Sequence, residues 1–221
     1  MTLLIFDCDG VLVDSEVIAH QVLLDAIAPL GLAIPLAESF ALFAGRSLKD
    51  TLAIIERELG RPLPADFLEQ SRELLFRRFR RCLKPVTGVV DAISALPYAR
   101  CVASSSSFDR LRLALEVTGL SPLFGANVFS ATQVLLGKPA PDLFLFAAGQ
   151  MGASPAHCIV IEDSALGVEA GRAAGMRVVG FAGASHATDA LRDTLPAAGA
   201  HRVIRTMRDL PRCIEMLKVA E

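Results

Sequence analysis

Two aspartates, Asp7 and Asp9, directly follow the first apolar run of the chain, Leu3–Phe6, within the segment Asp7-Cys8-Asp9-Gly10. A carboxylate can attack phosphorus and form an aspartyl-phosphate. It can also ligate Mg²⁺, which prefers oxygen donors. A polar turn that only caps a helix uses the same residue types, so this motif by itself leaves both interpretations open.

The apolar run is typical of a buried strand in a parallel sheet, and open α/β sheets bind ligands beyond the carboxyl ends of their strands. Two later apolar runs also end in polar residues: 101–103 leads into Ser104 and Ser105, and 158–161 leads into Glu162 and Asp163. Between them, Lys138 precedes a turn that contains two prolines. We therefore expect acids, hydroxyls and a lysine at one sheet edge.

The distribution of apolar residues predicts an α/β fold. Strands are expected at 100–104, 127–130, 158–162, 177–182 and 202–205, with helices between them, which indicates a doubly wound parallel sheet. Residues 16–83 instead show helical periodicity, with a first helix that Ser15 is placed to cap. The expected domains are an α/β core of residues 1–15 and 84–221 and an all-helical insert of residues 16–83.

Bulk composition excludes several classes of protein. The chain has 221 residues and a net charge of −2, so no global field favours nucleic acid or an anionic membrane. No apolar run has the length of a membrane span, and no signal-peptide pattern is present. The five cysteines are scattered, without metal or redox spacing. A reduced, cytoplasmic protein, monomeric or weakly homo-oligomeric, is expected.

Taken in order, these motifs resemble the haloacid dehalogenase (HAD) superfamily, specifically its small-molecule phosphatases and the β-phosphoglucomutase-like group. The resemblance runs from Leu3 to the last predicted strand near Val203, with extended matches at 7–16 and 137–142. It implies a Rossmann-like core with a helical cap domain, and an enzyme that acts on a small phosphorylated metabolite.

The resemblance also implies roles for the acids. Asp7 would attack phosphorus, and Asp9 would protonate the leaving oxygen and then deprotonate the hydrolytic water. Mg²⁺ would be held by an Asp7 oxygen, the backbone carbonyl of Asp9 and Asp163, with Glu162 as a further candidate ligand. A cap of the next helix by Asp163 or Ser164 is the alternative for that acid pair.

Phosphate binding is expected from Ser104, the Ser105 backbone N–H and Lys138, which would also neutralise Asp7. The serine run 104–107 could instead begin a helix, and these roles are compatible because helix N-termini bind phosphate. Arg46 in the cap is a candidate clamp for a second anionic group, or else a solvated loop residue.

The expected function is Mg²⁺-dependent hydrolysis of a sugar or sugar-acid phosphate. A phosphomutase is the first alternative, but Ala19 and Leu48 stand where the mutase pattern has histidine and arginine. Hydrolytic dehalogenation is another alternative, but it needs neither a metal nor a second aspartate, so Asp9 and Asp163 argue against it. A phospho-acceptor signalling module, which needs no cap, is more remote.

Overall fold

The computed structural model describes residues 2–43 and 48–218. The chain divides into two compact units. One contains Met1–Asp14 and Lys84–Glu221, and the other contains Ser15–Leu83.

The first unit is built on a six-stranded parallel sheet with the order β3-β2-β1-β4-β5-β6. The strands are β1 (Leu3–Phe6), β2 (Ala99–Ser104), β3 (Val128–Ser130), β4 (Cys158–Glu162), β5 (Arg177–Phe181) and β6 (Arg202–Ile204). The predicted strands are confirmed to within one residue at each end. The chain moves outward from β1 through β2 and β3 and then returns to β4, beside β1, so the strand order reverses at β1. In open α/β sheets this reversal point is where ligands bind.

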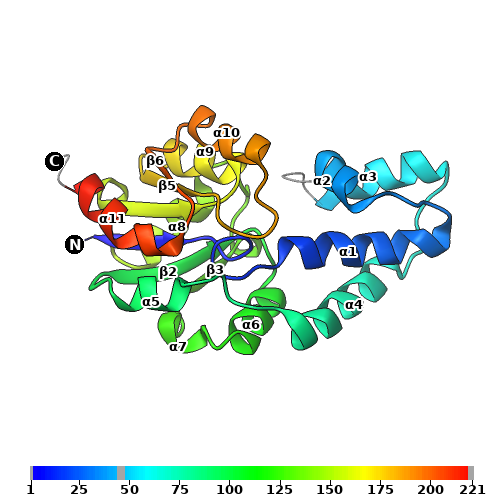
Figure 1. The fold of residues 1–221 in the computed structure, drawn as a ribbon, viewed down its shortest axis with the longest axis horizontal. Coiled ribbons are helices and arrows are strands. Elements are labelled where there is room, and N and C mark those ends of the chain that lie inside the picture. Colours follow the sequence, from blue (N-terminus) through cyan, green and yellow to red (C-terminus); the bar gives the residue numbers. More distant parts are fainter. Residues whose placement is uncertain (1, 44–47, 219–221) are drawn as a thin grey trace. The chain divides into compact units, whose positions relative to one another are not determined.

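Helices cover both faces of this sheet (Figure 1). They are α5 (Val89–Ser94), α6 (Phe108–Val117), α7 (Ser121–Phe124), α8 (Asp142–Gln150), α9 (Ala165–Ala173), α10 (Asp189–Ala197) and α11 (Leu210–Lys218), with short 3₁₀ helices at Ala131–Gln133, Pro155–His157 and Met207–Asp209. Alternate residues of the central strands pack with α8 and α9 in one core cluster. Phe6 points the other way and meets Phe124 of α7 edge-on at 5.9 Å.

Gly171 shows how closely α9 approaches the sheet. A Cβ atom at this position would lie 2.7 Å from Cγ2 of Val178 in β5. The glycine therefore permits tight packing of the helix on the sheet.

The second unit is all-helical. It contains α1 (Glu16–Ile27), a 3₁₀ turn (Ala28–Leu30), α2 (Leu36–Phe43), α3 (Leu48–Leu59) and α4 (Phe67–Cys82). Their apolar faces share a small core of Leu24, Ile27, Phe43, Ile55 and Phe67. Helix α2 was not expected as a separate element. The prediction that Ser15 caps α1 is wrong, because its backbone is already helical and its side chain makes no capping hydrogen bond.

Among residues 2–43 and 48–218, no helix combines the length and apolar character needed to cross a bilayer.

Candidate active site

The candidate site lies where the first and fourth strands end. Register pairs Phe6, the last residue of β1, with Val102 of β2 and Ile161 of β4, so β4 ends one residue and β2 two residues beyond β1. The next residue, Asp7, continues the ladder through a 3.0 Å hydrogen bond from its N–H to the carbonyl of Ile161. Strand pairing thus delivers Asp7 to the reversal point of the sheet.

A buried lysine holds Asp7 in place. Nζ of Lys138 lies 2.5 Å from Oδ1 of Asp7 and 2.6 Å from Oε1 of Glu162. It also donates a 3.3 Å hydrogen bond to the carbonyl of Ala103. An ammonium group has three N–H donors, so these contacts use all of them. The side chains of Lys138, Asp7 and Glu162 are only 6%, 8% and 1% exposed, and the lysine is fixed at this point.

Electrostatics keep this lysine charged. Burial lowers the pKa of Lys138, but the charges of Asp7 and Glu162 and their hydrogen bonds outweigh it, so that the pKa lies above its usual value. Burial raises the pKa of Asp7 well above the ordinary range. Lys138 opposes that rise, and the charges of Glu162 and Asp163 add to it. One cation thus faces an excess of buried carboxylates.

Glu162 is committed to Lys138 and to the start of α9. Its second oxygen, Oε2, accepts hydrogen bonds of 2.9 Å from the backbone N–H and from the hydroxyl of Ser164. Gly167 provides the space, because a Cβ atom there would lie 1.9 Å from the Glu162 carboxyl group. Ser164 caps α9 by accepting from the N–H of Gly167. Of the two residues expected as an alternative cap of this helix, Asp163 and Ser164, it is Ser164 that caps α9. Ligation of a metal by Glu162 stays a prediction.

Asp163 approaches the Asp7–Asp9 loop at Gly10. This glycine has a positive φ of 75°, and a Cβ atom on it would lie 1.8 Å from Oδ2 of Asp163. The same oxygen is 3.2 Å from Nε2 of His186. Burial raises the pKa of Asp163, whereas the hydrogen bond from His186 lowers it. Gly10 is required for close approach as well as for the turn.

The donor set fits a hard divalent cation. Asp7 and Asp163 are buried carboxylates, and burial raises the pKa of each, with the charge of the neighbouring Glu162 adding to the rise. Within the described residues, no three His, Cys, Asp or Glu side chains form a ready-made metal cluster. Mg²⁺ characteristically binds through one or two carboxylates, waters and substrate phosphate, so the residues present suit it.

Asp9 has a different environment. Its Oδ2 accepts a 2.6 Å hydrogen bond from the hydroxyl of Ser106, and its Oδ1 lies 2.7 Å from Nη2 of Arg110. The side chains of Asp9 and Arg110 are 13% and 23% exposed. The second acid of the loop is therefore more accessible than Asp7.

The serine motif lies beside these acids. Ser104 is the last residue of β2 and is buried, and its hydroxyl accepts from the N–H of Ser106 at 3.2 Å. Ser105 follows as an exposed residue. Ser107, not Ser104, occupies the N-cap position of α6, and it makes no capping hydrogen bond. Arg46 lies outside the described residues.

Three residues of this site escaped sequence reasoning: Ser106, Arg110 and His186. Ser106 belongs to the serine run 104–107, but the sequence does not show which group its hydroxyl contacts. Arg110 sits on α6 and His186 on the loop after β5, and both meet their acids only because the sheet brings distant segments together. The same loop anchors Asp14, whose Oδ1 accepts from the hydroxyl of Ser185 at 2.7 Å.

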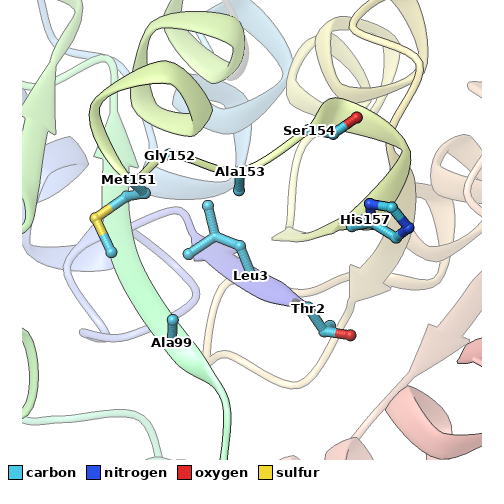
Figure 2. A pocket seen from close by; sticks show the side chains of 8 residues that line it. All are labelled: Thr2, Leu3, Ala99, Met151, Gly152, Ala153, Ser154 and His157. Atoms are coloured by element: carbon cyan, nitrogen blue, oxygen red, sulfur yellow. The ribbon is translucent and has the colours of Figure 1, made fainter.

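A cavity of about 260 Å³ lies at the opposite edge of the sheet (Figure 2). Its wall includes Leu3 at the start of β1, Ala99 at the start of β2, and Met151, with Ser154 and His157 nearby. It contains no carboxylate and is distant along the strands from Asp7. We therefore place the candidate chemistry at the acid cluster and not in this cavity.

Comparison with known proteins agrees with this geometry. The family of haloacid dehalogenase-like hydrolases matches residues 1–175. The chain is 30% identical to a 6-phosphogluconate phosphatase of Escherichia coli over 82% of each protein. It is 32% identical to a fructose-1-phosphate phosphatase of the same organism, over 80% of this chain and 94% of that one.

Among solved structures, a conserved haloacid dehalogenase-like protein of unknown function from Agrobacterium tumefaciens is 44% identical. The match covers 99% of each chain with a TM-score of 0.88. The likeness therefore extends over the sheet, its helices and the helical insert.

Proposed function

The chain belongs to the haloacid dehalogenase-like hydrolase family and is a phosphoric monoester hydrolase, and we propose that it hydrolyses a small sugar or sugar-acid phosphate through an aspartyl-phosphate on Asp7. The observation that carries the proposal is the contact of 2.5 Å between Asp7 and the buried Lys138 at the reversal point of the sheet. A fixed carboxylate beside a fixed cation is the arrangement that attack on a phosphate anion requires.

In the first step, a carboxylate oxygen of Asp7 attacks phosphorus as the bond from phosphorus to the ester oxygen breaks. Asp9 gives a proton to that departing oxygen. In the second step, Asp9 takes a proton from water, whose oxygen attacks phosphorus and releases Asp7. Lys138 stabilises the phosphoryl charge in both steps, and Ser104 with the Ser105 N–H binds the phosphoryl oxygens.

Mg²⁺ is part of the proposal. Asp7, the backbone carbonyl of Asp9 and Asp163 would hold it, and it would supply charge neutralisation between the carboxylates and the phosphate. We assign Glu162 to orienting Lys138, because its oxygens already contact Lys138 and Ser164.

The substrate class rests on the two relatives, one named for a sugar-acid phosphate and the other for a sugar phosphate. We propose that the helical insert, with Arg46, selects among such molecules. A cytoplasmic location and a monomeric or weakly associated state complete the proposal.

A phosphate-release screen tests it. The purified protein is incubated with a panel of phosphorylated sugars, sugar acids and polyols, with Mg²⁺ or with EDTA, beside Asp7→Asn. We expect steady turnover only with Mg²⁺ and an intact Asp7. Conversion of a sugar phosphate to its isomer without phosphate release would indicate a mutase, and labelling that stops at one phosphate per chain would indicate a signalling module.

A further inference from the structure

We propose that Arg110 and Ser106 are positioning residues that orient the Asp9 carboxyl group, which gives its proton to the leaving group and regains one from water. The inference rests on the proposed function, because Asp9 acts there as the acid and base. It adds two residues that no motif of the sequence identifies.

Each oxygen of Asp9 has its own donor. The Ser106 hydroxyl engages Oδ2 at 2.6 Å, and Nη2 of Arg110 engages Oδ1 at 2.7 Å. A single hydrogen bond leaves a carboxylate free to rotate about its last torsion, whereas one donor on each oxygen fixes the plane of the group. Both donors come from the segment between β2 and the first turn of α6, so one structural element supplies both contacts.

That element is itself anchored. The N–H of Ser106 donates to the hydroxyl of Ser104 at 3.2 Å, and the carbonyl of Ser106 accepts from the hydroxyl of Ser130 at 2.7 Å. Ser130 is fully buried at the end of β3. The orientation of Asp9 is thus tied to the ends of two strands, and a catalytic group held by such support keeps its geometry.

The position of Arg110 favours a role in the reaction over a role in folding alone. Its side chain is 23% exposed, and it engages the partly accessible Asp9. Lys138 in contrast is 6% exposed and lies between two buried acids. Misplacing a catalytic group by about 1 Å costs about 10²-fold in rate, so loss of Arg110 should affect proton transfer first.

The experiment compares two kinds of ester. An alkyl phosphate needs its leaving oxygen protonated, whereas p-nitrophenyl phosphate leaves as a stable anion. For Arg110→Ala we expect kcat with the best alkyl phosphate of the panel to fall about 10- to 100-fold, with a loss of at most about threefold in the burst of p-nitrophenol. Arg110→Lys should restore part of the loss, and Ser106→Ala should show the same pattern more weakly.

The matched control is Arg112→Ala, on the same helix. Its side chain is 76% exposed and pairs only loosely, at 3.8 Å, with Asp109. We expect its kcat to remain within about twofold of wild type for both esters. Equal losses of Arg110→Ala on both esters without rescue by lysine would show a merely structural role and overturn the proposal.

A double-mutant cycle identifies the partner. If Arg110 acts through Asp9, adding Arg110→Ala to Asp9→Asn should change the rate by less than about twofold. A full additional loss, or a rate increase in the single variant, would overturn the inference. Absence of phosphate release by the wild type from every ester would instead contradict the proposed function. Asp7-dependent release with Arg110→Ala equal to Arg112→Ala would contradict this inference alone.

Discussion

The loop that carries Asp7 and Asp9 presents two acids to two different surroundings. On one side, Asp7 lies in a buried cluster with Lys138 and Glu162, all less than a tenth exposed. On the other side, Asp9 meets Arg110 and Ser106 nearer the surface. Asp7 and Asp9 have the same side chain and only one residue between them. They differ in the side chains that pack around them.

This difference matches the demands of the two proposed roles. A nucleophile needs a fixed approach to phosphorus, and burial beside a lysine supplies it. A general acid and base must exchange protons in each cycle and therefore needs access. The two sides should consequently respond differently to substitution.

The largest effect is expected for Asp7→Asn. The substitution removes the attacking oxygen and changes little volume, so turnover should be abolished and the fold retained. Phosphate release and circular dichroism measure the two outcomes. Activity within about tenfold of wild type would contradict the nucleophilic assignment, since covalent catalysis through Asp7 accounts for the whole reaction.

Asp9→Asn should lower turnover of ordinary phosphate esters by about 10²–10⁴-fold, the usual contribution of a general acid–base group. The first step with p-nitrophenyl phosphate should suffer less, because that leaving group needs little protonation. Its phosphoenzyme should then accumulate, since activation of water is still impaired. Rapid-quench measurement with both esters checks this, and equal losses without a trapped intermediate would refute the role of Asp9.

Lys138→Met should lower kcat by about 10²–10³-fold, the effect of removing one electrostatic stabiliser. It also leaves two acids buried without their cation, which costs about 3–5 kcal/mol of unfolding free energy. The matched variant Lys138→Met with Glu162→Gln should recover part of the melting temperature but none of the rate. Arg110→Ala should destabilise less, because its ion pair is more exposed. A similar loss of stability in Lys138→Met and Arg110→Ala would contradict the proposed difference between the surroundings of Asp7 and Asp9.

Much of the fold was predictable from sequence. The strands are short, continuous apolar runs that are buried in the sheet, and their alternation with helices fixes a parallel arrangement. Helix α2 was missed because Leu36–Phe43 is short and lies between Pro35 and Gly45, where local signals indicate a break. Ser15 has the residue type of a helix cap but a helical backbone, which no residue type reveals.

Part of the site was likewise predictable from the sequence, and part was not. Asp7, Asp9, Ser104, Glu162 and Asp163 stand at or just after strand ends, so strand prediction brings them to one edge. Arg110 and His186 depend on how α6 and the loop after β5 pack, and sequence spacing carries no such information. The partner of Glu162 also had to come from the structure, because a carboxylate beside a metal and one beside a lysine look alike in sequence.

The smallest predicted effect concerns Asp163 and its pH dependence. Burial raises the pKa of Asp163 in the folded protein, whereas in the unfolded chain an aspartate has a pKa of about 3.9. The folded state therefore holds this proton more tightly. The stability that results is present in full below about pH 4 and is lost as the pH rises through the folded-state pKa.

Asp163→Asn removes this pH-dependent loss. In EDTA, the variant should melt above wild type near neutral pH, because it no longer carries a charge that burial disfavours. The difference should shrink towards about pH 4, where wild-type Asp163 is protonated. Mg²⁺ should raise Tm of the wild type, because it binds the ionised carboxylates of the folded state, and it should do little for the variant. A Tm difference independent of pH, with an unchanged response to Mg²⁺, would show that burial does not disfavour the charge of Asp163 and that Asp163 holds no metal. That outcome would leave the cluster of Asp7, Lys138 and Glu162 as the whole electrostatic site.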